Sequence, residues 1–204
     1  MDISEHSKTN LKEQRDHGSF SFPCGLYETY DNPCWPGAKH HWHDEMEILY
    51  FMEGQFELIV NMETYSIDRE CFYFINPGEL HSIIVHSLCK ESAVLFHPRI
   101  LSFDYYDTAQ SRILQPMLKG ELYFPRCVFP EHPVFRSLKK EYLEIVNVFY
   151  QKGFSRPNED QTIIEDLASQ LFIRADLLKI LGHLERFSLL SSEEHTDDYR
   201  VNII

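Results

Sequence analysis

The stretch His41-Trp42-His43-Asp44-Glu45-Met46-Glu47, which runs on through an apolar segment to Gly54, decides the fold. Side chains of a β-strand alternate between its two faces, so residues of equal parity share a face. His41, His43 and Glu47 all have odd numbers. If the segment is extended, these three side chains point the same way and can converge on one ion. Imidazole together with carboxylate suits Zn, Fe, Ni, Mn or Cu.

His81 is a fourth candidate ligand. It follows the residues Asn76-Pro77-Gly78-Glu79 and opens a second apolar run, Ile83-Ile84-Val85. Proline next to glycine marks a turn, and a short apolar run after a turn is typical of a strand. The sequence therefore predicts that His81 stands at the start of a strand and can complete the ligand set.

This spacing resembles that of a known family. His-x-His, three residues, Glu, six residues and Gly is similar to the first cupin motif, and Gly78-x-x-His81 is similar to the core of the second. The second match is partial, because Glu70, Asn76 and Val85 stand where the family usually has glycine, proline and asparagine. The resemblance implies a mostly β fold, a double-stranded β-helix that forms a jelly-roll-like barrel. It also implies one divalent transition metal (Zn, Ni, Fe or Mn), with these ligands: His41, His43, Glu47 and His81. The alternative is a vestigial site that binds no metal.

The wider context is similar to the N-terminal effector domain of AraC-family transcription regulators. The similarity rests on the segments 41–50, 74–82 and 113–125 and extends over roughly residues 20 to 190. It implies a small-molecule effector, such as a sugar or a related metabolite, in the barrel. It also implies a homodimer and a DNA-binding helix-turn-helix part that would follow this chain and is absent from it.

Short apolar segments with turn residues between them predict an all-β sandwich or barrel over residues 19–130, independently of the resemblance. The segment Met46–Met52 is apolar on both faces, which is typical of a strand buried on both sides. The other expected strands are an edge strand within Phe20–Tyr30, Phe56–Met62, Tyr65–Ile67, Cys71–Ile75, His81–Ser87, Ser92–His97 and a last strand at Leu122–Phe124, with a short helical piece at Ala109–Leu114.

Helical periodicity replaces the strand pattern over residues 131–190. One amphipathic helix is predicted from the apolar repeat Phe135, Leu138, Tyr142, Ile145 and Phe149. A second helix, capped by Asn158 and running to about Leu189, should pack antiparallel to it. Its stripe begins with Ile164 and Leu167. The leucines predicted to form a dimer interface are Leu171, Leu178, Leu181 and Leu184. The alternative is that the first helix and the barrel cover these leucines.

The two ends of the chain are polar. The lack of apolar periodicity over residues 1–18 predicts that this segment is a flexible tail. Residues 191–204 are expected to form an acidic linker and the start of a missing C-terminal DNA-binding module. The linker is expected because the segment begins polar and acidic, and the module because an apolar pattern begins at Tyr199 and stops at Ile204.

Composition excludes several classes of function. The net charge is −13 and no cluster of Lys and Arg occurs, so direct nucleic-acid binding by this chain is not expected. No apolar run reaches the roughly 20 residues that a membrane-spanning helix needs, and no signal-peptide core is present. A cytoplasmic protein with no membrane contact is expected. The five cysteines show no C-x-x-C pair, which argues against a disulfide framework.

Two functions fit these features. The first is a sensor, the effector-binding and dimerisation domain of an AraC-like regulator. The second is a stand-alone metal-dependent cupin enzyme of the dioxygenase or sugar isomerase type, since the ligand set leaves coordination positions open. No acid-base pair beyond the ligands is evident, so the sensor is favoured and no catalytic residue is assigned. Four aromatic side chains are expected to line the ligand pocket or else to be plain core: Trp42, Phe51, Phe56 and Tyr73.

Overall fold

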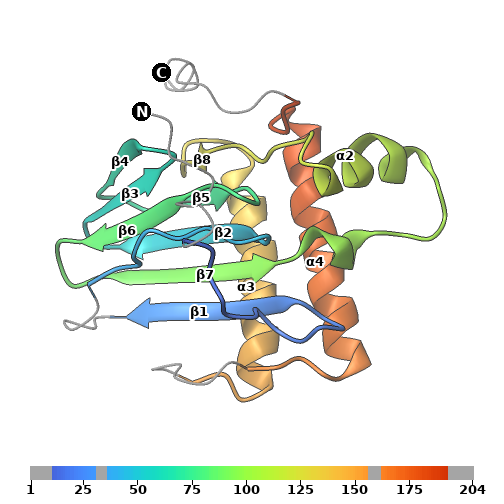
Figure 1. Ribbon diagram of the computed structural model, residues 1–204, viewed down its shortest axis with the longest axis horizontal. Helices are drawn as coiled ribbons and strands as arrows, with labels where there is room; N and C mark the ends of the chain where they lie inside the picture. Colours follow the sequence, from blue (N-terminus) through green and yellow to red (C-terminus); the bar gives the residue numbers. More distant parts are fainter. Residues whose placement is uncertain (1–10, 31–35, 156–161, 193–204) are drawn as a thin grey trace.

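The computed structural model describes residues 11–30, 36–155 and 162–192, and its chain folds into two antiparallel sheets (Figure 1). Cys34, Asn158 and the predicted linker beyond Ser192 lie outside these ranges. The large sheet has the strand order β1 (Cys24–Tyr30), β7 (Lys90–Phe96), β2 (Met46–Glu53), β5 (Cys71–Ile75) and β8 (Cys127–Val128). The small sheet has the order β4 (Glu63–Ile67), β3 (Phe56–Val60) and β6 (His81–Val85).

The central strand β2 has two buried faces, as its sequence predicts. Its odd-numbered residues Leu49 and Phe51 lie between the two sheets, in a core that both sheets share. Its even-numbered residues Ile48 and Tyr50 lie in a second core with the helices. Because side chains alternate along a strand, one strand thus contributes to two cores. The two facing sheets confirm the predicted cupin barrel.

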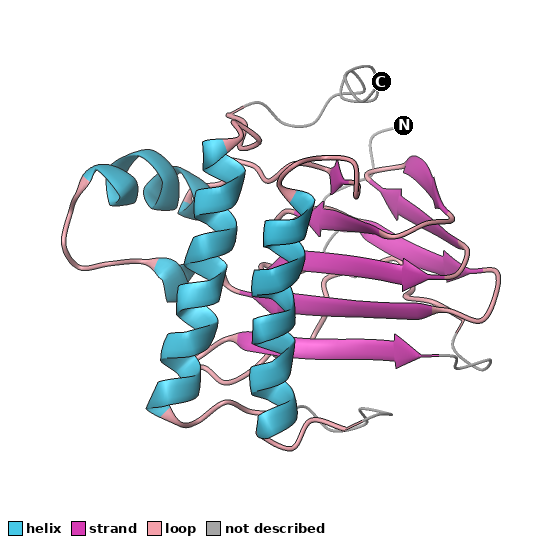
Figure 2. Cartoon of the chain, turned by 180° about the vertical axis from the view of Figure 1, so that it is seen from behind, coloured by secondary structure: helices cyan, strands magenta, loops and turns pink. Residues whose placement is uncertain are grey.

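Two long helices cover the outer face of the large sheet (Figure 2). The helix α3 (Phe135–Gln151) and the helix α4 (Leu167–Arg186) run antiparallel and pack against each other, as predicted. Tyr142 of α3 is fully buried, and its hydroxyl lies 2.8 Å from Ser92 Oγ of β7. Burial of a large side chain of this kind contributes about 1.5–3 kcal/mol to the stability of the fold. The helical hairpin is therefore part of the same folded unit as the barrel.

Shorter helical segments lie between β7 and β8. They are a 3-10 helix (Pro98–Leu101), a π-helix (Gln110–Leu114) and α2 (Gln115–Leu118), which continues the π-helix. The predicted helical piece at Ala109–Leu114 is thus present and extends to Leu118. None of the described helices combines the length and the apolarity needed to cross a bilayer.

The start of the second long helix and the position of the last strand are predicted wrongly from the sequence. The helix α4 begins at Leu167 instead of near Asn158, because the Asp166 side chain caps it by accepting a hydrogen bond of 3.0 Å from the Ser169 N–H. Ile164 is buried but precedes the helix. The last strand is β8 and not Leu122–Phe124. Instead, Tyr123 forms an isolated bridge with Ser191, outside the sheets.

Gly54, which closes the first motif, is needed for the turn between β2 and β3. Its φ is +122°, and a Cβ atom there would lie 2.6 Å from Cys89 Cβ and 2.9 Å from Cys89 Cα. Gly78 also has a positive φ, +80°, but a Cβ atom there would meet nothing within 4 Å. A residue other than glycine would therefore be strained by the positive φ at both positions, whereas its Cβ atom would clash with a neighbour only at position 54.

We expect Gly54→Ala to lower the free energy of unfolding by about 2 kcal/mol, because strain and overpacking act together. Gly78→Ala serves as the matched control and should cost about 1 kcal/mol from strain alone. Urea denaturation of both variants measures the difference. Equal losses would show that contact with Cys89 is not what requires glycine at position 54.

Candidate metal centre

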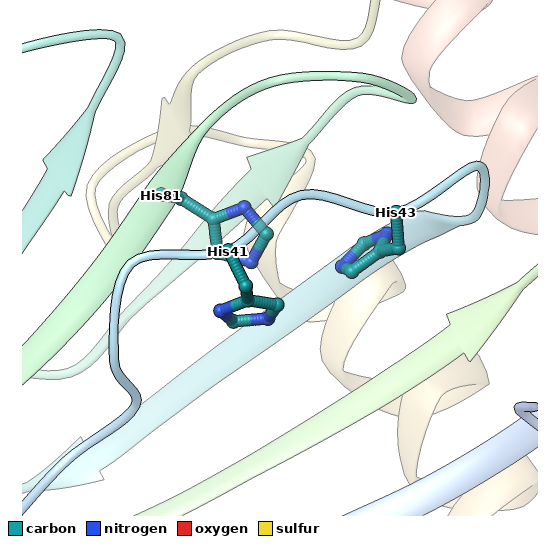
Figure 3. Close-up of side chains that lie close together, drawn as sticks. All are labelled: His41, His43 and His81. Atoms are coloured by element: carbon teal, nitrogen blue, oxygen red, sulfur yellow. The ribbon is translucent and has the colours of Figure 1, made fainter. Parts of the chain in front are cut away.

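Three histidines converge at one end of the barrel. His41 and His43 lie on the segment that leads into β2, and His81 begins β6 (Figure 3). Their potential ligand nitrogens all lie within 4.8 Å of one another. The chain bends at Asp44 and Glu45 before β2 begins. The backbone hydrogen bonds between His41 and His81, 2.9 and 3.0 Å long, join the two segments and bring the motifs together.

Backbone carbonyls determine which nitrogen of each imidazole is free. His41 Nδ1 lies 2.7 Å from the Lys39 carbonyl oxygen, His43 Nδ1 lies 3.1 Å from that of Glu45, and His81 Nδ1 lies 2.9 Å from that of Glu79. A carbonyl oxygen only accepts, so Nδ1 carries the proton in each ring. The lone pair of a neutral ring is then on Nε2, which is the usual arrangement for a metal-binding histidine.

Glu47 adds a carboxylate to the three imidazoles. Its Oε2 atom lies 3.1 Å from His81 Nε2 and 3.4 Å from His43 Nε2. These three atoms are buried and have no hydrogen-bond partner among the described residues. Buried acceptors that face one another without a donor are unfavourable. A cation placed among them would satisfy all three, so the residues present fit a metal ion.

The electrostatics of the site favour the metal-binding forms of Glu47 and His41 but not that of His43. Burial alone would raise the pKa of Glu47, but the adjacent imidazoles of His43 and His81 hold it well below its ordinary value. Burial and the neighbouring His81 lower the pKa of His41. Glu47 is therefore ionised and His41 neutral near pH 7, as metal ligation requires. Burial lowers the pKa of His43, but Glu47 outweighs that effect and raises it.

The N-terminal segment lies against this site, contrary to the predicted flexible tail as far as residues 11–18 are concerned. The Glu13 N–H donates to the Trp42 carbonyl at 2.9 Å, and the Trp42 N–H donates to the Leu11 carbonyl at 3.1 Å. Glu13 Oε2 consequently lies 3.6 Å from His41 Nε2 and 3.3 Å from His17 Nε2. Glu13 and His17 were missed in the sequence because they belong to no motif.

A buried ion pair supports the second motif. Arg126 Nη1 donates to Glu79 Oε2 at 2.9 Å and to the Phe74 carbonyl at 2.8 Å, and Arg126 Nη2 contacts Glu79 Oε1. The Asn76 N–H also donates to Glu79 Oε2, at 2.7 Å. Since the Glu79 carbonyl accepts from His81 Nδ1, this pair fixes the turn that positions a candidate ligand.

A cavity of about 300 Å³ lies beside the histidines. It includes His41 and Glu47, and its other polar lining residues are Glu13, Arg15, His17, Tyr27, Glu28, Thr29 and Glu91. The apolar lining residues are Ala38, Ile83, Ala93 and Leu95. The candidate metal centre therefore opens into a space large enough for a small molecule.

The four aromatic residues predicted for the ligand pocket do not lie together. Phe51, Phe56 and Tyr73 pack against one another in the core between the sheets, with ring centroids 4.7 Å (Phe51–Phe56) and 6.0 Å (Phe51–Tyr73) apart. Trp42 is half-buried and lines a different cavity of about 540 Å³, next to the turn at Gly78. The lining residues of the cavity at the histidines include none of the four.

The leucines predicted for a dimer interface divide into two groups. Leu181 and Leu184 are covered by the core of the chain itself, with 4% and 0% of their surface exposed, so they are not available to a partner. Leu178 is half-buried, whereas Leu171 is 62% exposed. Two neighbours on α4, Leu167 and Phe172, are 76% and 61% exposed. The exposed apolar surface therefore lies on the first half of the helix.

A two-sheet antiparallel barrel with a His-x-His, Glu and His cluster at one end defines the cupin class. Residues 26–112 match the family model of the AraC-like ligand binding domain. The chain is 33% identical over 73 residues to YdeC, an uncharacterised HTH-type transcriptional regulator of Bacillus subtilis (strain 168). That alignment covers 35% of this chain and 25% of the regulator.

Solved cupin structures resemble the chain over a limited part. An RmlC-like cupin from Shewanella frigidimarina is 14% identical with a TM-score of 0.30, and the alignment covers 36% of this chain and 67% of that one. The Cnp3 cupin domain of Schizosaccharomyces pombe is 14% identical with a TM-score of 0.31, over 37% of this chain and 56% of that one.

Proposed function

We propose that this chain is the effector-sensing and dimerisation domain of an AraC-like transcriptional regulator, and that a small molecule binds in its barrel. The observation that carries the proposal is the cluster of unpartnered buried atoms on His43, Glu47 and His81, in a chain whose residues 26–112 match the model of the AraC-like ligand binding domain. His41 completes the set. A bound Zn, Ni, Fe or Mn ion would supply a Lewis-acidic centre for an effector oxygen or nitrogen.

The residues of this chain have separate roles in that scheme. The carbonyls of Lys39, Glu45 and Glu79 orient the imidazoles, and the ion pair of Arg126 with Glu79 keeps the turn rigid. The barrel core and the hairpin share the large sheet. A ligand with different affinities for two arrangements of the hairpin would shift the population between them.

A metal-dependent cupin enzyme is the second candidate function. The cavity beside the histidines supports it, because a substrate could reach the metal centre there. Glu13 and His17 line the same cavity, with Glu13 Oε2 3.3 Å from His17 Nε2. We assign no catalytic residue to this pair or to any other described residue. Binding without conversion of the bound compound distinguishes the sensor from this enzyme.

A screen of sugars and related metabolites tests effector binding. Compounds that raise the melting temperature of the protein should bind the variant Ala38→Trp at least tenfold more weakly, because Ala38 lines the cavity and a large side chain there narrows it. Leu88→Trp is the control, because Leu88 is 58% exposed and is not among the residues that line the cavity. Equal loss in both variants, or none in Ala38→Trp, would contradict binding in the barrel.

The exposed Leu167 and Leu171 of α4, together with the half-buried Leu178, support a symmetric homodimer. Leu167, Leu171 and Leu178 follow one another at intervals of four and seven residues, so they share one side of the helix. An apolar stripe of this kind on the surface is typical of a protein-protein interface. The natural partner for such a stripe is the same stripe on a second copy, related by a two-fold axis.

We expect Leu171→Glu to weaken the dimer by about 2 kcal/mol, or roughly 30-fold in the dissociation constant, because it places a charge in an apolar interface. Leu143→Glu is the matched control, since Leu143 on α3 is also exposed (43%) but lies on a different helix. Sedimentation equilibrium of both variants measures the effect. A dimer that tolerates Leu171→Glu as well as Leu143→Glu would not use this stripe.

A further inference from the structure

Glu91 on β7 points into the barrel and not towards the helices. It pairs with Phe51 of β2 and with Thr29 of β1. Its neighbour Ser92 faces the opposite side, where its hydroxyl contacts Tyr142 of α3. Because side chains alternate along a strand, Glu91 shares the inner face with Ala93 and Leu95. Only 4% of its surface is exposed.

The Glu91 carboxyl group has no partner within the described parts of the chain, where it forms neither a hydrogen bond nor an ion pair. It nevertheless lines the cavity of about 300 Å³ beside the histidines. A buried carboxyl group without a partner destabilises a fold, and an apolar residue would fill the position better. Burial raises the pKa of this group well above its ordinary value, and the nearby Glu47 and Glu28 add to the effect. Glu91 therefore has no evident role in folding.

The surroundings of Glu91 are rich in acceptors and negative charge. Glu47 lies at the histidine end of the cavity, and Glu13 also lines it. The one arginine among the lining residues, Arg15, is exposed, and its guanidinium lies 4.9 Å from the centre of the Tyr27 ring. Such a cavity attracts a cation and repels an anion. An anionic carboxylate or phosphate ligand would face these glutamates without a buried cation of the protein to pair with.

We propose that Glu91 is the recognition residue of the barrel cavity and that it binds the ammonium group of a small organic amine. An ammonium group donates up to three hydrogen bonds and would give Glu91 both a donor and a counter-charge. The metal centre at the other end of the cavity would receive a second polar group of the same molecule. The inference deepens the proposed function and rests on it, because it specifies the chemical class of the effector.

Matched triplets of probes test this recognition. We would measure binding of 1,4-diaminobutane, 1,4-butanediol and succinate, and of glucosamine, glucose and glucuronate, to the intact purified protein by calorimetry. Within each triplet the compounds share a carbon chain and differ chiefly in charge. At least one amine is expected to bind more tightly than its neutral and anionic counterparts. Glu91→Gln should then lower the affinity for that amine roughly 10- to 100-fold, because the variant loses a charged hydrogen bond to the ligand.

The substitution should leave the fold intact. Glu91→Gln keeps the shape of the side chain and removes a buried ionisable group, so its melting temperature is expected to equal or exceed that of the unsubstituted protein. Glu57→Gln is the matched control, because the Glu57 side chain is 40% exposed and does not line the cavity. It should bind the amine normally.

Three results would overturn the inference. They are tighter binding of the neutral or anionic members, equal binding of the amine to Glu91→Gln and to the unsubstituted protein, and no binding of any amine at millimolar concentration. The first two results leave the sensor proposal standing, because a small molecule still binds. If no compound of any charge binds in this test or in the metabolite screen, the sensor proposal fails as well.

Discussion

Replacing Arg126 with alanine is expected to lower the free energy of unfolding by about 3–5 kcal/mol, because it leaves the Glu79 carboxylate buried without its counter-charge. Both side chains are more than nine-tenths buried, with 6% of Arg126 and 7% of Glu79 exposed. Arg126 also donates to the Phe74 carbonyl, which loses this donor in the variant. Urea denaturation at pH 7 measures the loss.

An exposed ion pair provides the control. Lys139 Nζ lies 2.7 Å from Glu70 Oε1, but the two side chains are 40% and 34% exposed. Solvent screens such a pair, so Lys139→Ala should cost no more than about 1 kcal/mol. The double variant Arg126→Ala/Glu79→Ala should regain part of the loss, since no unpaired charge remains. If Arg126→Ala costs no more than Lys139→Ala, the buried pair does not hold the turn before His81.

Replacing His43 with alanine is expected to lower the affinity for Zn or Ni by at least roughly 100-fold, because His43 Nε2 is one of the unpartnered atoms that face the centre. His81→Ala should have a similar effect. The metal content of the purified proteins and competition with a chelator measure it. The loss of metal affinity should be larger than in Arg126→Ala, because Arg126 acts on the site only through Glu79.

A histidine outside the site distinguishes this effect from weak surface binding. The His86 side chain is 47% exposed and pairs with Glu57 at 3.4 Å, so His86→Ala should bind metal like the unsubstituted protein. Equal affinity of His43→Ala, His81→Ala and the unsubstituted protein would show that the cluster is not a metal site. The vestigial alternative would then apply.

The grouping of His41, His43 and Glu47 could be predicted from the sequence because the signal is local and periodic. Because their residue numbers are all odd, His41, His43 and Glu47 are expected on the same face of an extended segment. The structure brings all three to the same end of the barrel, although the chain bends at Asp44 and Glu45. His81 followed from its motif. The alternation of Met46–Met52 likewise predicted a strand with two buried faces, which the two cores confirm.

Long-range contacts could not be predicted in this way. Glu13 and Arg126 reach the site from distant segments, one through backbone pairing with Trp42 and the other through Glu79. Glu91 lies just before the predicted strand Ser92–His97, and only the observed register of β7 places its side chain on the inner face. Charged residues are usually exposed, so a sequence pattern gives no reason to expect a buried one.

The faces of α4 illustrate a further limit of periodicity. The helix carries two apolar stripes, and the sequence does not indicate which of them packs on the barrel. The buried stripe contains Ile173, Leu177 and Ile180, whereas Leu167 and Leu171 are exposed. The Asp166 cap also shifts the start of the helix away from Asn158. Tertiary packing decides both features.

The most direct test of the sensor proposal follows a bound compound over time. A compound that raises the melting temperature of the metal-loaded protein, and loses this effect in Ala38→Trp, would be incubated with the protein and observed by NMR. The proposal predicts binding of about one equivalent per chain and recovery of the compound unchanged. Conversion of many equivalents into a product, abolished in His43→Ala, would contradict it and identify the chain as a metal-dependent cupin enzyme.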